Sequence, residues 1–295
     1  MKNKKTGKVL KSILRWIGHQ DWIRYGIRYR IIRRFSNPEN SLSCDFDIDF
    51  YGMRYDGNLR CYIDWVVYFF GAYEKYELFM LRDLVKDRLE PVFIDIGANI
   101  GHHSLFMSQH CDLVHAFEPF EPVGCRLEQK IQRNSITNIV VHKVGLGHED
   151  LELLYFAPKG HNTGTGSFVP SHESENNESN EKLQVVNADA YFSRMGLSKI
   201  DLIKIDVEGF ERNVLLGLRD TLLKYRPIVF MEFSDETKCS LRGKDEFMSL
   251  FPSDYCVRTV QTYRPSFVIF SKPGYSYTEF DFEESGVNLI LFPGS

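Results

Sequence analysis

Strand and helix patterns alternate along the chain from residue 92 onward. Short runs of Val, Ile, Leu and Phe predict buried strands, and apolar residues spaced three and four apart predict amphipathic helices. The predicted strands are 92–96, 112–117, 138–144, 199–206 and 227–233, and the predicted helices are 102–110, 121–133, 187–195 and 209–225. This alternation predicts an α/β fold with a doubly wound, mostly parallel sheet. Strand-like pieces after residue 250 predict an antiparallel close to the sheet.

The first 36 residues have a different pattern, in which apolar and basic residues alternate. In KVLKSILRWIG, Val9, Ile13 and Ile17 recur at helical spacing with lysine and arginine between them, and WIRYGIRYRIIRRF continues the pattern with five arginines. We predict a basic amphipathic helical extension over residues 1–36.

The segment between this extension and the first predicted strand contains a hairpin signal and a helix signal. Residues 44–63 alternate between polar and apolar and contain Asp56-Gly57-Asn58, which predicts a small hairpin that turns at these three residues. Residues 71–89 have a helical pattern that a proline then stops.

One long polar segment interrupts the later strands and helices. Residues 157–182 are rich in Gly, Ser, Asn and Glu and are too numerous for an ordinary connection. We expect the first half to be a functional lid and the second half to be disordered. The remainder from 44 to 295 is predicted to be one domain with this lid as an insert.

Composition and charge narrow the class of protein. The chain has 295 residues and an ordinary globular composition, with 43% hydrophobic residues and six cysteines that form no CxxC pair, which favours a reducing compartment. No apolar run is long enough to span a bilayer and the basic N-terminus lacks the apolar core of a secretory signal, so we expect a cytoplasmic protein.

The net charge of −4 conceals an asymmetry between the extension and the rest. Residues 1–35 contain eleven Lys or Arg and one acid, a net charge of +10, which leaves −14 for the remainder. The extension could lie on an anionic membrane surface, pack its apolar stripe on the domain, or contact nucleic acid. The acidic remainder disfavours nucleic acid, and membrane contact would place the protein at the inner membrane surface.

The segment FIDIGANIGHHSLF, residues 93–106, predicts a strand that passes through a tight glycine turn into a helix. The turn is GxxxG rather than the GxGxxG of a dinucleotide site, and Asp95 at its mouth would repel a pyrophosphate. S-adenosylmethionine has no phosphate and carries a sulfonium and an ammonium, so a carboxylate here suits that cofactor. The plainer interpretation is a strand-to-helix turn with a capping acid.

A second acid falls at the position expected for ribose binding. Glu118 ends the next strand, in HAFEPF, and lies 23 residues after Asp95. An acid at this spacing can accept hydrogen bonds from a ribose diol. It could instead be a solvated loop residue before Pro119.

Further acids follow the strands of SKIDLIKIDVEGFERNVLLGL and PIVFMEF. Asp206 and Glu208 follow one strand, and Glu232 ends the next. The carboxyl ends of parallel strands line one crevice, so these acids should crowd together with Asp95 and Glu118. Crowded carboxylates need a balancing cation and are candidates for a functional site. The alternative is that Glu208 and Glu211 favour the positive end of a helix, with Lys204 as an ion-pair partner.

Together these segments resemble the FkbM family of S-adenosylmethionine-dependent methyltransferases. The resemblance covers roughly 45–270 and rests on GAYEKYE, FIDIGANIGHHSL, HAFEPF, HNTGTGS, IDLIKIDVEGFERNVLLGL and PIVFMEF. It implies a Rossmann-like, seven-stranded methyltransferase sheet and O-methylation of hydroxyls of sugars or polyketides. The residues that it assigns to the cofactor are Asp95, Gly97, Asn99, Gly101, Glu118 and Glu74. His102-His103 stand where family members often have aromatic residues.

The resemblance also implies that the carboxylates of Asp206 and Glu208 face the methyl-transfer site. Either could accept the proton of the acceptor hydroxyl, with His161 of the lid as an alternative base. A Mg²⁺ or Ca²⁺ ion could instead bridge Asp206, Glu208 or Glu232 to the acceptor, since hard cations prefer oxygen ligands.

The acceptor that we favour is a sugar hydroxyl of a cell-surface glycan or glycolipid, which could be lipid-linked and so bring the enzyme to the membrane. The main alternative is a catalytically inactive methyltransferase fold that serves as a glycan-binding or scaffolding module. A nicotinamide oxidoreductase and a membrane-surface adaptor are weaker alternatives, because the first needs GxGxxG and the second would not need the acids.

Overall fold

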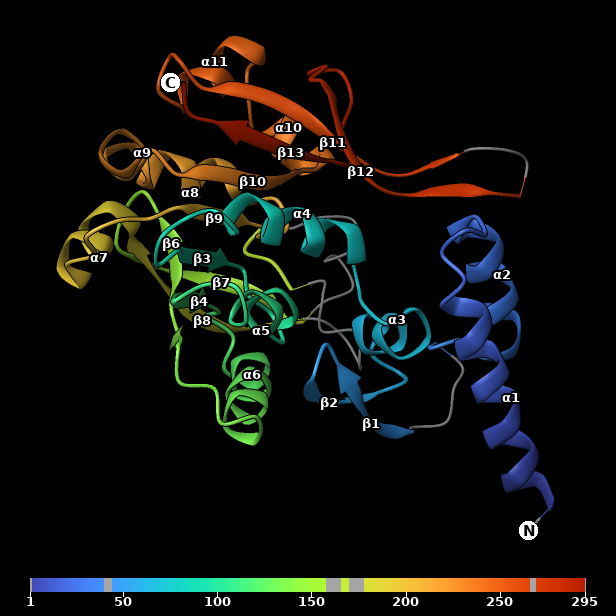
Figure 1. Ribbon diagram of the computed structural model, residues 1–295. Helices are drawn as coiled ribbons and strands as arrows, with labels where there is room; N and C mark the ends of the chain where they lie inside the picture. Colours follow the sequence, from blue (N-terminus) through green and yellow to red (C-terminus); the bar gives the residue numbers. More distant parts are fainter. Residues whose placement is uncertain (1, 40–43, 158–165, 170–177, 266–268, 295) are drawn as a thin grey trace. The chain divides into compact units, whose positions relative to one another are not determined.

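The computed structural model describes residues 2–39, 44–157, 166–169, 178–265 and 269–294 (Figure 1). The chain divides into two compact units. The first comprises Met1–Met80, Gly160–Gly164 and Gln261–Ser276, and the second comprises Leu81–Lys159, Thr165–Val260 and Tyr277–Ser295. None of the helices in the described part of the chain combines the length and the apolarity needed to cross a bilayer.

The first unit is built around a helical pair and a hairpin. Its elements are α1 (Lys2–Gly18), α2 (Tyr25–Phe35), β1 (Asp45–Phe50), β2 (Met53–Asn58), α3 (Tyr62–Phe70) and the start of α4 (Lys75–Val85). Helix α1 packs against α2 and α3. Their shared core contains Leu14, Ile32, Trp65 and Phe69. Part of the apolar stripe of the predicted extension therefore packs inside this unit.

The second unit holds the main sheet apart from residues 261–265 and 271–276, which lie in two strands at one edge and belong to the first unit. The strands of this sheet hydrogen-bond in the order β12-β11-β13-β10-β9-β3-β4-β5. Strands β5, β4, β3, β9 and β10 are parallel, and β13 runs antiparallel between β10 and β11. The bounds are β3 (Val92–Ile96), β4 (Leu113–Phe117), β5 (Ile139–His142), β9 (Leu202–Ile205), β10 (Ile228–Phe233), β11 (Cys256–Pro265), β12 (Ser271–Glu279) and β13 (Val287–Phe292).

This topology confirms the predicted doubly wound, mostly parallel α/β fold with an antiparallel close. The sheet has eight strands rather than seven, because β12 adds to β11 at the edge. The strand order reverses between β3 and β9, and in open α/β sheets ligands bind at the carboxyl ends of the strands at such a point.

The remaining elements of the second unit are helices and a smaller sheet. Helix α5 packs on β3 and β4, and α6 packs on β5. The bounds are α5 (His102–Met107), α6 (Glu121–Arg133), β6 (Gly145–Gly147), β7 (Leu151–Ala157), β8 (Glu178–Asn187), α7 (Ala188–Met195), α8 (Glu211–Gly217), α9 (Arg219–Tyr225), α10 (Asp235–Cys239) and α11 (Lys244–Ser249).

The predicted hairpin is present, but the predicted position of its turn is wrong. Strands β1 and β2 pair antiparallel and are joined by Tyr51 and Gly52. Both residues adopt the left-handed conformation, with φ of 52° and 85°. This is the backbone that a two-residue hairpin turn requires.

Gly57, which we expected in the turn, lies inside β2 opposite Phe46. A Cβ atom at this position would lie 2.6 Å from Cγ of Asp64. The buried Asp64 carboxylate accepts hydrogen bonds from the Tyr55 hydroxyl at 3.0 Å and the Asn58 N–H at 2.9 Å. Glycine is therefore needed here for a close approach and not for a turn.

Two predicted helices have different bounds because of local contacts. The segment predicted as one helix over 71–89 begins only at Lys75, and Gly71 ends the preceding helix α3 with a φ of 90°. We missed α3 because its sequence is almost wholly apolar and lacks helical periodicity. The helix predicted over 209–225 is divided at Leu218 into α8 and α9. The residue before the division, Gly217, lies so close to β6 that a Cβ atom on it would be 1.9 Å from the backbone oxygen of Gly147.

The prediction for the loop over 157–182 is partly wrong. Residues 178–182, expected to be disordered, begin β8, which pairs antiparallel with β7 and parallel with β6. The segment is polar and has low strand propensity, so pairing with β7 overrides its local preference. Residues 158–165 and 170–177 lie outside the described residues.

Candidate active site

The strand register brings several of the predicted acids to one edge of the main sheet. Ile96 of β3 pairs with Phe117 of β4 and with Ile205 of β9, and Ile205 also pairs with Met231 of β10. The residues one position beyond these pairs are Gly97, Glu118, Asp206 and Glu232. Asp95 lies two positions deeper, at the level of Lys204.

The glycine turn between β3 and α5 depends on left-handed backbone at three positions. Gly97, Asn99 and Gly101 have φ of 81°, 51° and 83°. A Cβ atom on Gly97 would lie 1.8 Å from the backbone oxygen of Asp206, and one on Gly101 would lie 2.1 Å from Leu127. Only glycine satisfies both requirements, so the turn lies in direct contact with the end of β9.

Glu118 is bonded to this turn by its carboxylate. One oxygen accepts a hydrogen bond from the Asn99 N–H at 3.0 Å, and the other accepts from the Phe120 N–H at 2.9 Å. The side chain is buried. Burial raises the pKa of Glu118 to about 7, against the opposing effect of the two N–H donors, and the charge of Asp95 adds to the rise. Each oxygen has a second lone pair that a ribose hydroxyl could use.

Asp95 lies beneath the turn rather than at its mouth. Its carboxylate is fully buried, accepts a hydrogen bond from the Ser104 hydroxyl at 2.6 Å, and lies 3.5 Å from the Lys204 ammonium. Burial raises the pKa of Asp95, although Lys204 and Ser104 oppose the rise. Lys204 also donates to Asp206 at 3.0 Å. The crowded carboxylates are thus balanced by one buried cation, the ion-pair role that we had considered for Lys204.

Asp206 is the most solvent-exposed of the three charged side chains Asp95, Lys204 and Asp206. Its side chain is 35% exposed, compared with 2% for Lys204. Its N–H donates to the Ile96 carbonyl at 3.0 Å, which holds it beside the glycine turn. Gly97 and Asn99 are also partly exposed, while the strands behind them are buried. The accessible surface of the site therefore includes both the turn and the Asp206 carboxylate.

A second turn, Asp206 to Gly209, follows β9 and is held by a carboxylate whose role we did not predict. Glu211 is fully buried and accepts hydrogen bonds from the N–H groups of Val207 at 3.0 Å and Gly209 at 3.3 Å, and from the Thr237 hydroxyl. Burial raises its pKa. Its position in the first turn of α8 was the only sequence signal, and we had attributed that to the helix dipole.

Glu208 lies in this second turn, in the left-handed conformation with a φ of 51°. Its carbonyl oxygen accepts from the Ser167 hydroxyl at 2.6 Å, and the same hydroxyl accepts from the Val169 N–H at 2.9 Å. Residues 166–169 of the predicted lid are therefore anchored at Glu208. The proposed base His161 lies outside the described residues.

Four aromatic rings connect the loop after β4 to the second turn. Phe120 follows Glu118, Phe210 follows the second turn, and the ring centroids of Phe120, Tyr155, Phe168 and Phe210 lie 5.0, 5.3 and 5.5 Å apart in succession. Burial raises the pKa of Tyr155, and the charges of Glu118 and Glu208 add to the rise. The charges of both carboxylates therefore affect the same hydroxyl, that of Tyr155. The aromatic spacing in sequence gave no sign of this cluster.

The other predicted site residues, Glu232 and Glu74, have fewer described contacts with the glycine turn and the carboxylate cluster. Glu232 lies in β10 opposite Asn288 and is partly exposed. Glu74 belongs to the first unit and adopts a φ of 49°, and its closure over the cofactor stays a prediction. Within the described ranges, no group of three or more His, Cys, Asp or Glu side chains has the arrangement of a metal site, so the suggested Mg²⁺ or Ca²⁺ gains no support.

A sheet of this order, with a glycine turn after its first central strand and an acid after the second, defines a Rossmann-like methyltransferase. Residues 95–248 match the model of the methyltransferase FkbM domain, which is more than half of the chain. The chain belongs to the FkbM family of S-adenosylmethionine-dependent methyltransferases.

Curated relatives and solved structures share parts of this chain. It is 29% identical over 195 residues to the AMB antimetabolite synthetase AmbE of Pseudomonas aeruginosa, covering 54% of this chain and 9% of the synthetase. It is 24% identical over 144 residues to Methyltransferase 1 of Beauveria bassiana, covering 43% of this chain and 58% of that protein. The crystal structure of methyltransferase FkbM from Methylobacillus flagellatus KT is similar at 16% identity and a TM-score of 0.43, over 77% of this chain and 52% of that one. The chain thus spans less than two thirds of each.

Proposed function

We propose that this protein is an O-methyltransferase that methylates a sugar hydroxyl in a cell-surface glycan or glycolipid. The observation that carries the proposal is Asp206, whose backbone carbonyl lies against Gly97 of the glycine turn and whose partly exposed carboxylate accepts a hydrogen bond from Lys204 at 3.0 Å. A proton acceptor thereby stands beside the turn that would hold the methyl donor.

The residues around the turn fit S-adenosylmethionine. Glu118 retains lone pairs for the two ribose hydroxyls, and the turn carries no residue that would bind a pyrophosphate in preference. Asp95 and Asp206 place negative charge near the turn, which suits the positive charges of the cofactor's methionine part. When bound, the cofactor supplies an electrophilic methyl group on a sulfonium.

Asp206 is suited to accept the proton of an alcohol. A hydroxyl becomes a better nucleophile as its proton is accepted, and a carboxylate within hydrogen-bond distance can take that proton while the oxygen forms its bond to the methyl carbon. The Lys204 ammonium fixes the orientation of this carboxylate. Holding the oxygen and the methyl group in line supplies much of the remaining catalysis.

The charges of the site favour a neutral acceptor that is rich in hydroxyls. Asp206, Glu208 and Glu232 are all partly exposed and offer only hydrogen-bond acceptors when ionised. A carboxylate or phosphate acceptor would be repelled, whereas a sugar presents several O–H donors to these acids. A polyketide with several hydroxyls is the alternative acceptor of the same chemistry.

The test is transfer of isotope-labelled methyl from S-adenosylmethionine to a panel of methyl glycosides, amine-free polyketide alcohols and carboxylic acids. We expect alkali-stable label on a glycoside, because a methyl ether resists the base that hydrolyses a methyl ester. Asp206→Asn should lower the rate by at least about 100-fold, since general base catalysis contributes that much. Asp245→Asn, which changes an exposed acid on α11, is the matched control.

Label on carboxylic acids alone would overturn the acceptor class. Binding of S-adenosylhomocysteine without transfer to any acceptor would favour the inactive module. Glycan binding by the Asp206→Asn variant would then distinguish a glycan-binding module from a scaffolding module.

A further inference from the structure

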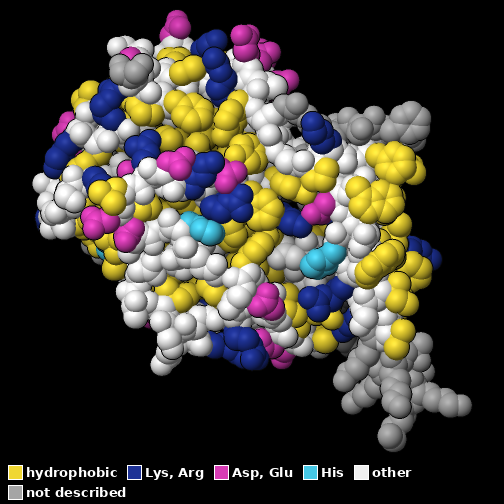
Figure 2. All heavy atoms as spheres, viewed as in Figure 1, with side chains coloured by type: hydrophobic (Ala, Val, Ile, Leu, Met, Phe, Trp, Pro, Cys, Tyr) yellow, Lys and Arg dark blue, Asp and Glu magenta, His cyan; other side chains and the backbone are white. Residues whose placement is uncertain are grey.

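Exposed apolar side chains are concentrated on the first unit. Of the fourteen large apolar side chains that are exposed in the described part of the chain, nine belong to this unit. They are Val9, Leu10, Ile13, Trp16, Trp22, Ile31, Phe35, Ile269 and Phe270. Figure 2 shows hydrophobic side chains following α1 and α2 along the right-hand edge of the view. A patch of this kind marks an interaction surface.

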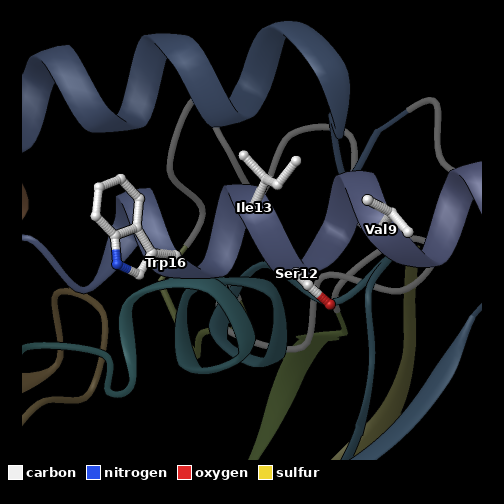
Figure 3. Close-up of a pocket in the computed structure, with 4 residues that line it drawn as sticks. All are labelled: Val9, Ser12, Ile13 and Trp16. Atoms are coloured by element: carbon white, nitrogen blue, oxygen red, sulfur yellow. The ribbon is translucent and has the colours of Figure 1, made fainter.

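The apolar arc of helix α1 is only partly buried. Leu14, at one edge of the arc, is buried in the core of the unit at 2% exposure and accounts for the packing alternative. Val9, Ile13 and Trp16, toward the other edge, are 60%, 50% and 66% exposed. Figure 3 shows these three side chains on successive turns, with Ser12 beside them. The four residues line a depression of about 400 Å³. Packing against α2 and α3 therefore leaves one side of the apolar arc exposed.

Aromatic residues extend this surface beyond α1. Trp22 lies in the connection between α1 and α2, with its ring centroid 5.8 Å from that of Phe270. The segment that carries Phe270 is fixed to the connection by hydrogen bonds from the Arg24 N–H to Ile269 and from the Ser271 N–H to Trp22, at 3.0 and 2.9 Å. Tryptophan is enriched where proteins meet the interface between lipid and water.

The charge around the patch is mainly positive, although the exposed Glu39 pairs with Arg33 of α2 at 2.7 Å. Residues 1–35 contain eleven basic residues and one acid, Asp21. That acid is already paired with Arg28 at 2.9 Å and with Lys75. Arg30 and Arg34, one turn apart on α2, are exposed and have no side-chain partner in the described part of the chain, and they flank the exposed Ile31 and Phe35. At least these two arginines are therefore available to contact an anionic partner.

We propose that the α1–α2 pair is a docking surface for an anionic lipid bilayer. Trp16, Trp22 and Phe35 would enter the interfacial layer while the surrounding lysines and arginines contact the headgroups, with the helices lying in the plane of the membrane. A protein partner would need a matching acidic rim around an apolar centre, whereas an anionic bilayer satisfies both the exposed apolar side chains and the excess of positive charge. This inference does not depend on methyl transfer, so its test uses no activity measurement.

The experiment is flotation of the full chain with vesicles of phosphatidylcholine, with or without phosphatidylglycerol. We expect binding only when phosphatidylglycerol is present, and weaker binding as salt rises. Ile13→Asp should reduce the affinity by at least about tenfold, which corresponds to keeping one large apolar side chain out of the bilayer. Leu223→Asp, which alters a similarly exposed apolar residue on α9 of the second unit, should bind as the native chain does.

Tryptophan fluorescence provides a second readout. Of the three tryptophans, Trp65 is fully buried, so a blue shift on adding vesicles reports Trp16 and Trp22. The shift should be reduced in both Trp16→Phe and Trp22→Phe.

Three outcomes would overturn the proposal. Equal binding to neutral vesicles would remove the role of charge, and equal loss in Leu223→Asp and Ile13→Asp would remove the role of this face. Dimerisation of the chain that Ile13→Asp abolishes, without vesicle binding, would assign the face to a second copy.

Discussion

Glu118 gives a prediction that connects burial to cofactor affinity. Burial raises the pKa of its carboxyl to about 7, and only the ionised form offers lone pairs on both oxygens to the ribose hydroxyls. The fraction ionised is about one tenth at pH 6 and about nine tenths at pH 8 for a group with this pKa. The affinity for S-adenosylhomocysteine should therefore be about tenfold weaker at pH 6 than at pH 8.

Isothermal titration calorimetry measures both the affinity and the proton that accompanies it. If the ionised form binds, about 0.9 proton is released per cofactor bound at pH 6 and about 0.1 at pH 8. Titrations in two buffers of different ionisation enthalpy give this number directly. An ordinary glutamate pKa would give a constant affinity and almost no proton release over the same range.

The Glu118→Gln variant isolates the contribution of this group. We expect its affinity at pH 8 to fall by about 1–3 kcal/mol, since hydrogen bonds to a charged acceptor are stronger than those to a neutral one, and its pH dependence to disappear. Glutamine has one acceptor oxygen for two backbone N–H groups, so thermal unfolding should confirm that the variant folds. Glu121→Gln, an exposed neighbour, is the control. A pH dependence that survives in Glu118→Gln would refute the reasoning.

Three further variants test the architecture around the site. Gly97→Ala should lower the free energy of unfolding by at least about 3 kcal/mol, because the added Cβ atom meets the backbone of Asp206. Gly196→Ala is the control, since Gly196 has a similar φ but open space around it, and it should cost about 1–2 kcal/mol. Equal losses in the two variants would exclude the close contact as a cause. Lys204→Met should cost about 3–5 kcal/mol at pH 8 and less as the pH is lowered, because burial raises the pKa of Asp95 and favours its neutral form, and adding Asp95→Asn should recover part of the loss in urea unfolding. Burial, reinforced by a neighbouring histidine, lowers the pKa of His142 to about 4. Stability should therefore fall as pH decreases from about 6.5 to 4, and an unchanged slope in His142→Phe would contradict this.

The sequence predicted the sheet well because its signal is strong and local. The runs that form β3, β4, β9 and β10 are mostly apolar and buried, with a single polar residue in each, namely Asp95, His115, Lys204 and Glu232. The order of strands and helices then sets the topology, and the topology alone brings Glu118, Asp206 and Glu232 to one edge.

The errors lie where tertiary contacts override local preference. Asp56-Gly57 has the composition of a turn, yet Gly57 is needed for the approach of Asp64. Glu211 resembles an ordinary residue of a first helical turn, but it is the acceptor for two N–H groups of the turn after β9. Both facts depend on which backbone meets which side chain across the fold, and a periodicity carries no such information.

The contact between Gly97 and the backbone of Asp206 has a mechanical consequence. The two turns touch without an intervening side chain, and the Asp206 N–H is also bonded to the carbonyl of Ile96. A displacement of the glycine turn would therefore push on Asp206, the residue that we propose as the proton acceptor. We expect binding of the methyl donor and alignment of the proposed base to be coupled for this reason, so an inhibitor that displaces the first turn should also displace Asp206 without contacting it.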